Sequence, residues 1–427
     1  MSYYNSIPNK FNRFLLLILT VSPFIAYLML TYFGVDFNKL FSVLSYFGVA
    51  LILIHGNKNN PIKFPTYLWF YLLFVLYVYF STFFLLDRKF KMIYLTNNFI
   101  IAINTLFIIE NLSINKKYYD YLFKISRNIL GIAVLVILIQ QAYDSNFFMN
   151  IRSTISLKEM NDATESRLDS IYSWVGEQSV GYCFVPIFLL VVEYFNKKKK
   201  KGKVLFWILL GIIFAVLTKA RWIMLNTLFV FIMIVVTEKD KIKTIISYSI
   251  LIPSILLFSY IVLNNVGINA EGIVKNRILE SDKKMNNKSA STRLLAISVF
   301  NRLYWKNAVF GVGDLKYGMG AAGKHNYELS KALGGKSSQI HVGFLSLFYT
   351  YGAIGGLLFM LFTYYILKQM YQDSKKTKLW APFFGVLGFF LANTTLVYLS
   401  FFEFGLIFAV MANKYFVKQV SQELKLS

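Results

Sequence analysis

The chain has 427 residues, of which 56% are hydrophobic and only 15% are charged, and its mean hydropathy is +0.52. Because an ordinary soluble domain carries about 25% charged residues, this composition excludes a soluble fold. Twelve membrane crossings of about 20 residues would use about 240 residues, close to the number of hydrophobic residues here. We therefore expect an all-α polytopic integral membrane protein, with residues 1–427 forming a single transmembrane helical domain.

The charge balance is strongly basic, with 45 Lys and Arg against 21 Asp and Glu and a net charge of +24. Most of these charges lie in short runs between apolar segments, where they set membrane topology, so we expect no nucleic-acid partner. The single cysteine, Cys183, excludes an internal disulfide and a thiolate metal site. The first apolar run, 14–33, lacks a small-residue cleavage site and is predicted to be a retained helix.

Apolar stretches bounded by charges predict twelve transmembrane helices in chain order. A tight hairpin near 395–400 separates the last two, since one helix over 380–414 would run about 52 Å, well beyond a bilayer core of about 30 Å. The predicted spans are 14–33, 38–54, 66–86, 92–109, 128–143, 179–195, 204–218, 222–236, 243–263, 341–367, 379–394 and 400–415.

The positive charges predict the orientation. With a cytoplasmic N-terminus, the inner segments hold 24 Lys and Arg and the short outer segments hold 9, of which Arg88, Lys89 and Lys91 form the one cluster against the trend. Cytoplasmic loops carry the excess of Lys and Arg, whereas long translocated loops are exempt from the rule. We expect both termini in the cytoplasm.

Two outer segments are too long to be simple connections. Residues 144–178 are acidic, whereas 264–340, between helices nine and ten, hold 12 basic against 5 acidic residues and fit anionic partners. We expect this long extracytoplasmic loop to carry amphipathic helices. One interfacial helix is predicted over 291–307, with Ser291 or Thr292 as its N-cap.

A few polar residues on the predicted outer face are candidates for chemistry. Lys219 and Arg221 interrupt an apolar hairpin, where they either line a functional site or simply mark the turn. Arg293 lies in the predicted amphipathic helix, and His341 opens the tenth helix. Gly311 and Gly313 follow no strand, so they indicate a turn and not a nucleotide cradle.

These positions resemble motifs of the O-antigen polymerase and O-antigen ligase superfamily of bacterial inner-membrane glycosyltransferases. Residues 217–221 (LTKAR) resemble its small-residue-then-Arg turn, although Ala220 replaces the usual Ser. Residues 291–294 (STRL), then Trp305 and 310–313 (FGVG), resemble the Arg, Trp and Gly-x-Gly stretch of its outer loop. His341, followed by Leu345, Gly352 and Gly355, resembles its His, Leu and Gly-x-x-Gly run, with Val342 where many members have Asn.

The resemblance implies transfer of a glycan from a polyprenyl-diphosphate-linked oligosaccharide, such as an undecaprenyl diphosphate conjugate, to a glycan acceptor. Arg221 and Arg293 would bind the diphosphate in place of a metal, because the Arg fork matches phosphate oxygens. His341 would be the catalytic base, kept neutral by the helix dipole and nearby arginines, and direct attack would invert the anomeric centre.

Further residues and partners follow from the same resemblance. Glu177, in a Gly-Glu-Gln-Ser stretch resembling a Glu-Pro-Ser element of some polymerases, Lys219 and His325 are auxiliary candidates for the acceptor. His325 precedes Asn326 but lies far from a Gly-x-x-Gly helix, in what we expect to be a less ordered part of the loop. We expect membrane lipids, a chain-length regulator or a flippase as partners, and neither a cofactor nor a metal.

Three alternatives stay open. A repeat-unit polymerase making O-antigen, capsule or exopolysaccharide is favoured, and an O-antigen ligase acting on a lipid acceptor of lipopolysaccharide is the nearest alternative. A lipid-linked oligosaccharide flippase or transporter usually shows two related halves, whereas here only the second half has the long loop. A metal-dependent glycosyltransferase would use carboxylates in its first outer loop, which offers only Asp36.

Overall fold

The computed structural model describes residues 38–55, 62–81, 93–111, 288–313, 321–333, 340, 342–392 and 409–417, with scattered positions between 14 and 35, 124 and 135, and 191 and 265. Within these residues all regular structure is helical, which confirms the all-α class. One helix there, Gly343–Thr377, is long and apolar enough to span a membrane. The full set of twelve helices remains a prediction.

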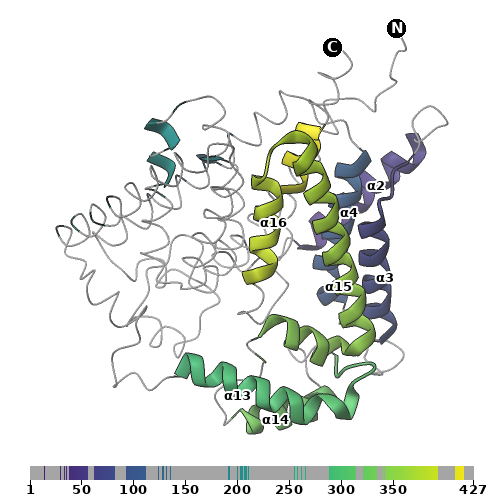
Figure 1. Ribbon diagram of the computed structural model, residues 1–427. Helices are drawn as coiled ribbons and strands as arrows, with labels where there is room; N and C mark the ends of the chain where they lie inside the picture. Colours follow the sequence, from purple (N-terminus) through teal and green to yellow (C-terminus); the bar gives the residue numbers. More distant parts are fainter. Residues whose placement is uncertain are drawn as a thin grey trace.

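The described helices form an upright bundle (Figure 1). It consists of α2 (Asn38–His55), α3 (Thr66–Phe80), α4 (Ile93–Asn111), α15 (Gly343–Thr377) and α16 (Ala381–Ala392). The helices predicted over 38–54, 92–109 and 379–394 are thus confirmed to within two residues. Continuous hydrophobic runs predicted these helices well, because each of these helices is apolar on most of its faces.

The centre of the bundle is aromatic. Tyr71 of α3 stacks on Phe362 of α15 with ring centroids 4.7 Å apart, and Phe74 meets Phe359 edge-on at 5.3 Å. All four side chains are fully buried. Because offset and edge-to-face pairs add about 0.5–1.5 kcal/mol each beyond area burial, these contacts fix α3 against α15.

Two predicted helix boundaries need correction. The tenth helix does not end at 367, because α15 continues to Thr377, and it is interrupted at Gly352. The last helix, predicted to end at 415, is helical over 409–417, since Asn413 and Lys414 pair with Asp373 and Glu110 and the helix continues through Tyr415, Phe416 and Val417. The helix predicted over 66–86 is α-helical over Thr66–Phe80, and residues 82–86 lie outside the described residues.

An arm of short helices crosses one end of the bundle (Figure 1). It comprises α13 (Lys288–Leu303), the 3-10 helix η4 (Tyr304–Asn307) and α14 (Ala321–Ala332). The helix predicted over 291–307 is confirmed, but its start was wrong, because Ser291 and Thr292 lie inside α13. Asn287 immediately precedes Lys288 in the sequence, and Asn is at least as good an N-cap residue as Ser.

Candidate functional site

The interruption of α15 joins the arm to the bundle. At Gly352 the backbone has φ 67° and ψ −172°, so the helical hydrogen bonds from residues 353 and 354 to residues 349 and 350 are not made. The amides of Ala353 and Ile354 instead donate to the carbonyls of Ala308 and Val309, at 2.7 and 3.3 Å. Every backbone group that the break frees at these four positions therefore needs a partner from residues 308–313.

The exchange is reciprocal. The amide of Val312 donates to the Tyr349 carbonyl at 3.1 Å, and the amide of Gly313 donates to the Thr350 carbonyl at 2.8 Å. We call residues 308–313 and 349–354 together the glycine junction. The junction thus supplies partners for the amides of Ala353 and Ile354 and for the carbonyls of Tyr349 and Thr350.

Two glycines make the close approach possible. A Cβ built on Gly311 would overlap the carbonyl of Thr350, and a Cβ built on Gly352 would overlap the carbonyl of Val309. Both glycines also have φ values, +76° and +67°, that L side chains rarely adopt. The Gly-x-Gly and Gly-x-x-Gly motifs of the sequence thus meet in one structure, and the predicted turn at 311–313 is part of it.

Tyr77 of α3 supports the junction from the bundle side. Its hydroxyl donates to the carbonyl of Phe310 at 3.1 Å, and its ring lies against Gly355. The sequence analysis missed Tyr77 because a Tyr within an aromatic helix carries no signal of its own.

The arm has a small hydrophobic core that includes the start of α15. Its buried members come from α13, the junction, α14 and the residues just before and within α15; these are Ala296, Val299, Leu303, Val312, Leu329, Leu333, Ile340 and Tyr349. Val342 and Leu345 pack against them. We call this set the arm core, and it makes α13, α14 and the entry to α15 one packed unit.

This unit contains three segments that the sequence singled out: the start of α13 with Arg293, the turn at 311–313, and the residues that flank His341. Arg293 belongs to α13, one turn before the buried Ala296. His341 lies outside the described residues, but its neighbours Ile340 and Val342 both pack on the arm core. Arg221, Lys219 and Glu177 also lie outside the described residues, so their place relative to the arm stays a prediction.

His325 was misjudged. It lies within α14 and not in a loosely ordered stretch, and Leu329 of α14 and Leu333, the residue after α14, are fully buried in the arm core. The helical pattern over 321–332 is short and interrupted by Gly323, which is why the sequence did not reveal it. His325 therefore belongs to the same packed arm as Arg293, and its auxiliary role stays a prediction.

The arm is basic. Residues 288–333 contain seven Lys and Arg against Asp314 and Glu328, and among them Arg302, Lys306 and Lys331 are exposed. Burial raises the pKa of the Tyr304 hydroxyl, which thus stays a neutral donor at physiological pH.

Within the described residues no group of three His, Cys, Asp or Glu is placed to hold a metal ion. Since the acidic segment 144–178 is not among them, metal independence remains a prediction.

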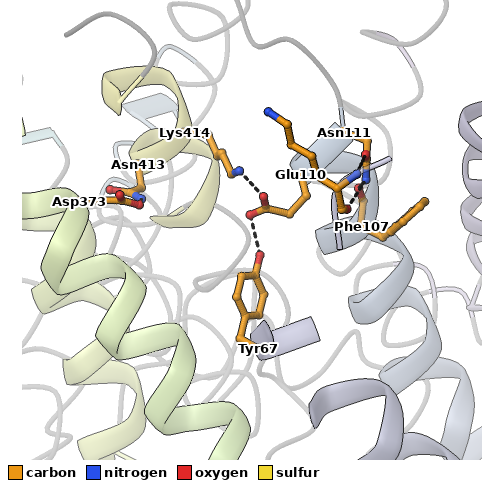
Figure 2. Close-up of polar contacts among 8 residues, drawn as sticks. Tyr67, Phe107, Glu110, Asn111, Asp373, Asn413 and Lys414 are labelled. Carbon is orange, nitrogen blue, oxygen red and sulfur yellow. Dashed lines mark hydrogen bonds and ion pairs between the residues drawn. The ribbon is translucent and has the colours of Figure 1, made fainter. Parts of the chain in front are cut away.

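A second polar cluster lies at the opposite end of the bundle (Figure 2). Glu110 of α4, whose side chain is 3% exposed, pairs with Lys414 and accepts a 2.7 Å hydrogen bond from Tyr67 of α3. Beside it, Asn413 donates to Asp373 of α15 at 2.8 Å. The sequence analysis passed over Glu110 because it sits one residue beyond the predicted helix 92–109, where a lone carboxylate looks solvated.

The described residues thus define a helical bundle with a basic arm locked into a broken helix. The model of the O-antigen ligase family matches residues 204–360, which include the arm, the glycine junction and most of the predicted motifs. This match confirms the resemblance to the O-antigen polymerase and ligase superfamily, whose members are bacterial integral membrane proteins that process glycans. No curated protein matches the chain.

Proposed function

We propose that the protein polymerises polyprenyl-diphosphate-linked oligosaccharide repeat units into a bacterial surface polysaccharide on the outer face of the cytoplasmic membrane. The observation that carries this proposal is the family match over 204–360, which coincides with the basic arm and its attachment to α15. A basic, well-packed surface at the membrane is suited to a lipid-linked diphosphate.

The proposed reaction is a direct displacement. The acceptor hydroxyl loses its proton to the imidazole of His341 as its oxygen forms a bond to the anomeric carbon of the donor. The bond from that carbon to the diphosphate oxygen breaks, and polyprenyl diphosphate leaves with both electrons. Attack opposite the leaving group inverts the anomeric centre.

Two arginines would stabilise the leaving group. Arg293 in α13 and Arg221 in the predicted outer turn would each offer a planar fork to the diphosphate oxygens, which takes the role that a divalent cation has in other transferases. Lys219 and Glu177 would assist the acceptor, and His325 is the competing candidate for the base.

The test is an assay of the purified protein in bilayers with a lipid-linked oligosaccharide. Products that lengthen by whole repeat units support polymerisation, whereas transfer of a finished chain to a lipid acceptor identifies the ligase alternative. Movement of donor across the bilayer without a new glycosidic bond would identify a flippase. Activity is expected to persist in excess EDTA, and loss that magnesium or manganese restores would establish a metal-dependent enzyme.

A further inference from the structure

Large apolar side chains are exposed along one face of each of the two central helices. On α3 they follow at spacings of four, three and four residues, and on α15 at three, four and three, so each set forms a straight stripe. The α3 stripe is Trp69, Leu73, Leu76 and Phe80, and the α15 stripe is Ile354, Leu357, Leu361 and Tyr364. Stripes of this length are far more apolar than the surface of a water-soluble protein.

The arm meets the stripes at the glycine junction. Val309 and Phe310, about half exposed, follow η4 directly, and the Val309 carbonyl accepts a hydrogen bond from Ile354 at the head of the α15 stripe. Trp305 is 76% exposed, with the exposed cations Arg302 and Lys306 beside it in the chain. An exposed Trp flanked by cations is typical of the lipid headgroup level.

A second aromatic and basic group marks the other end of α15. The Lys368 ammonium lies 5.7 Å from the Tyr364 ring and the Lys375 ammonium 4.7 Å from the Tyr371 ring. Tyr371 also contacts Trp380, with ring centroids 5.7 Å apart. Long cationic side chains and amphipathic rings gather where hydrocarbon meets water.

The separation of the two groups matches a bilayer. From Ala353 to Tyr371 the helix spans about 28 Å at 1.5 Å per residue, close to the hydrocarbon thickness of about 30 Å. In addition, α13 lies across the axis of α15, the direction that a helix takes when it rests in the plane of the interface (Figure 1).

We propose that the arm anchors the protein in the lipid headgroup layer at one face of the bilayer. Trp305, Val309 and Phe310 insert at the boundary of headgroups and acyl chains, Arg302 and Lys306 contact lipid phosphates, and α15 enters the hydrocarbon at Gly352. The residues before Gly352, including the flanks of His341, then stand at the level of a membrane-bound diphosphate. This assignment of depth is independent of any glycosyl transfer.

Depth-dependent fluorescence quenching tests the proposal. Single cysteines replace Trp305, Leu361, Tyr371 or Lys331 in a Cys183→Ala background, carry an environment-sensitive fluorophore, and are placed in bilayers of phosphatidylethanolamine and phosphatidylglycerol. Nitroxides on the headgroup should quench the labels at 305 and 371 more than nitroxides at mid-chain, and the order should reverse at 361. The label at 331 on α14 should respond only to a water-soluble quencher.

The charges have their own control. Arg302→Gln with Lys306→Gln should weaken headgroup quenching at position 305, whereas Lys331→Gln, which removes a cation from α14, should leave it unchanged. The proposal is overturned if the label at 305 behaves like the label at 331, which would place the arm in water. It is equally overturned if neither lipid-borne nor aqueous nitroxides reach 305, which would mean that protein covers this surface. Size-exclusion profiles identify variants that fail to fold, and the Leu361 and Tyr371 labels then still test the spacing.

Discussion

At the scale of single residues, Glu110 shows how the bundle tolerates a buried carboxylate. Its charge is paired with Lys414, and its second oxygen accepts the hydrogen bond from Tyr67, so three helical segments share one polar contact (Figure 2). A buried ion pair adds little stability relative to a well-packed apolar pair, but removing one partner leaves the other charge buried without a counter-ion.

Lys414→Ala should therefore destabilise the protein by about 3–5 kcal/mol, because the Glu110 carboxylate, 3% exposed, loses its counter-ion. Thermal unfolding in detergent measures the loss. Lys375→Met, which removes an exposed cation from the same end of the bundle, should change stability far less. In Glu110→Gln combined with Lys414→Met, most of the stability should return, and a double variant as unstable as Lys414→Ala would contradict the pairing.

The arginines of the proposed site make a second prediction at this scale. Arg221→Ala and Arg293→Ala should each lower glycan transfer by about 10²–10³, the usual cost of losing one preorganised charge-stabilising group. Lys at either position should restore only part of the rate, since an ammonium lacks the bidentate fork. Lys331→Ala is the matched control on the same arm. Full activity in a Lys variant would mean that a point charge suffices.

The base can be assigned by comparing the two histidines of the arm region. His341→Ala should lower the rate by about 10²–10⁴, the usual contribution of a general base, while donor binding is retained and His325→Ala costs little. The rate of the unaltered protein should fall as the pH drops through the titration of imidazole, near 6.5 when unperturbed, because protonation removes the accepting lone pair. Loss of donor binding in His341→Ala would make this histidine a diphosphate ligand, and an inactive His325→Ala would move the site onto α14.

At the scale of elements, the glycine junction determines how the arm is held. Gly352→Ala would force a side chain into a positive-φ extended conformation that is essentially restricted to glycine, at about 1–3 kcal/mol, and drive its Cβ into the carbonyl of Val309. We expect the arm to separate from α15, with loss of transfer and increased proteolysis between 304 and 340. Gly131→Ala is the control, because a Cβ built on Gly131 would meet nothing within 4 Å. Equal behaviour of the two variants would argue against the junction.

The elements also show what the sequence can predict. Apolar runs bounded by charged residues predict the ranges of α2, α4 and α16. This prediction does not depend on the surroundings, because a helix needs a continuous hydrophobic run whether it is buried in lipid or in protein. The break in α15 does not follow, because glycines at 352, 355 and 356 read equally well as close helix packing. Only the partner segment 308–313, more than 35 residues earlier, makes the break favourable, and such a long-range exchange of hydrogen bonds leaves no local pattern.

At the scale of the whole molecule, the motif order named the candidate residues, whose roles stay predictions, but it did not show how their segments assemble. The Arg, Trp, Gly and His positions were found from the motif order, and the structure adds why Gly311 and Gly352 belong together. The packing of α14 against α13 through Leu329 and Leu333 was not foreseen, because two short helices with mixed polarity show their common face only when folded. The same limit hid the contact between Glu110 and Lys414, which are 304 residues apart.

The orientation in the membrane is the last prediction. Lys63, Lys375 and Lys414 belong to the end of the bundle opposite the arm, and all three fall in segments predicted to be cytoplasmic. The 24 to 9 distribution of positive charges then places the arm outside. In a Cys183→Ala background, an impermeant thiol reagent applied to intact cells should label Lys331→Cys, whereas Lys200→Cys and Lys375→Cys should react only after the membrane is opened. Labelling of position 331 and position 375 from the same side would contradict an α15 that crosses the bilayer, and labelling of 200 and 375 without 331 would invert the topology and place the proposed transfer site in the cytoplasm.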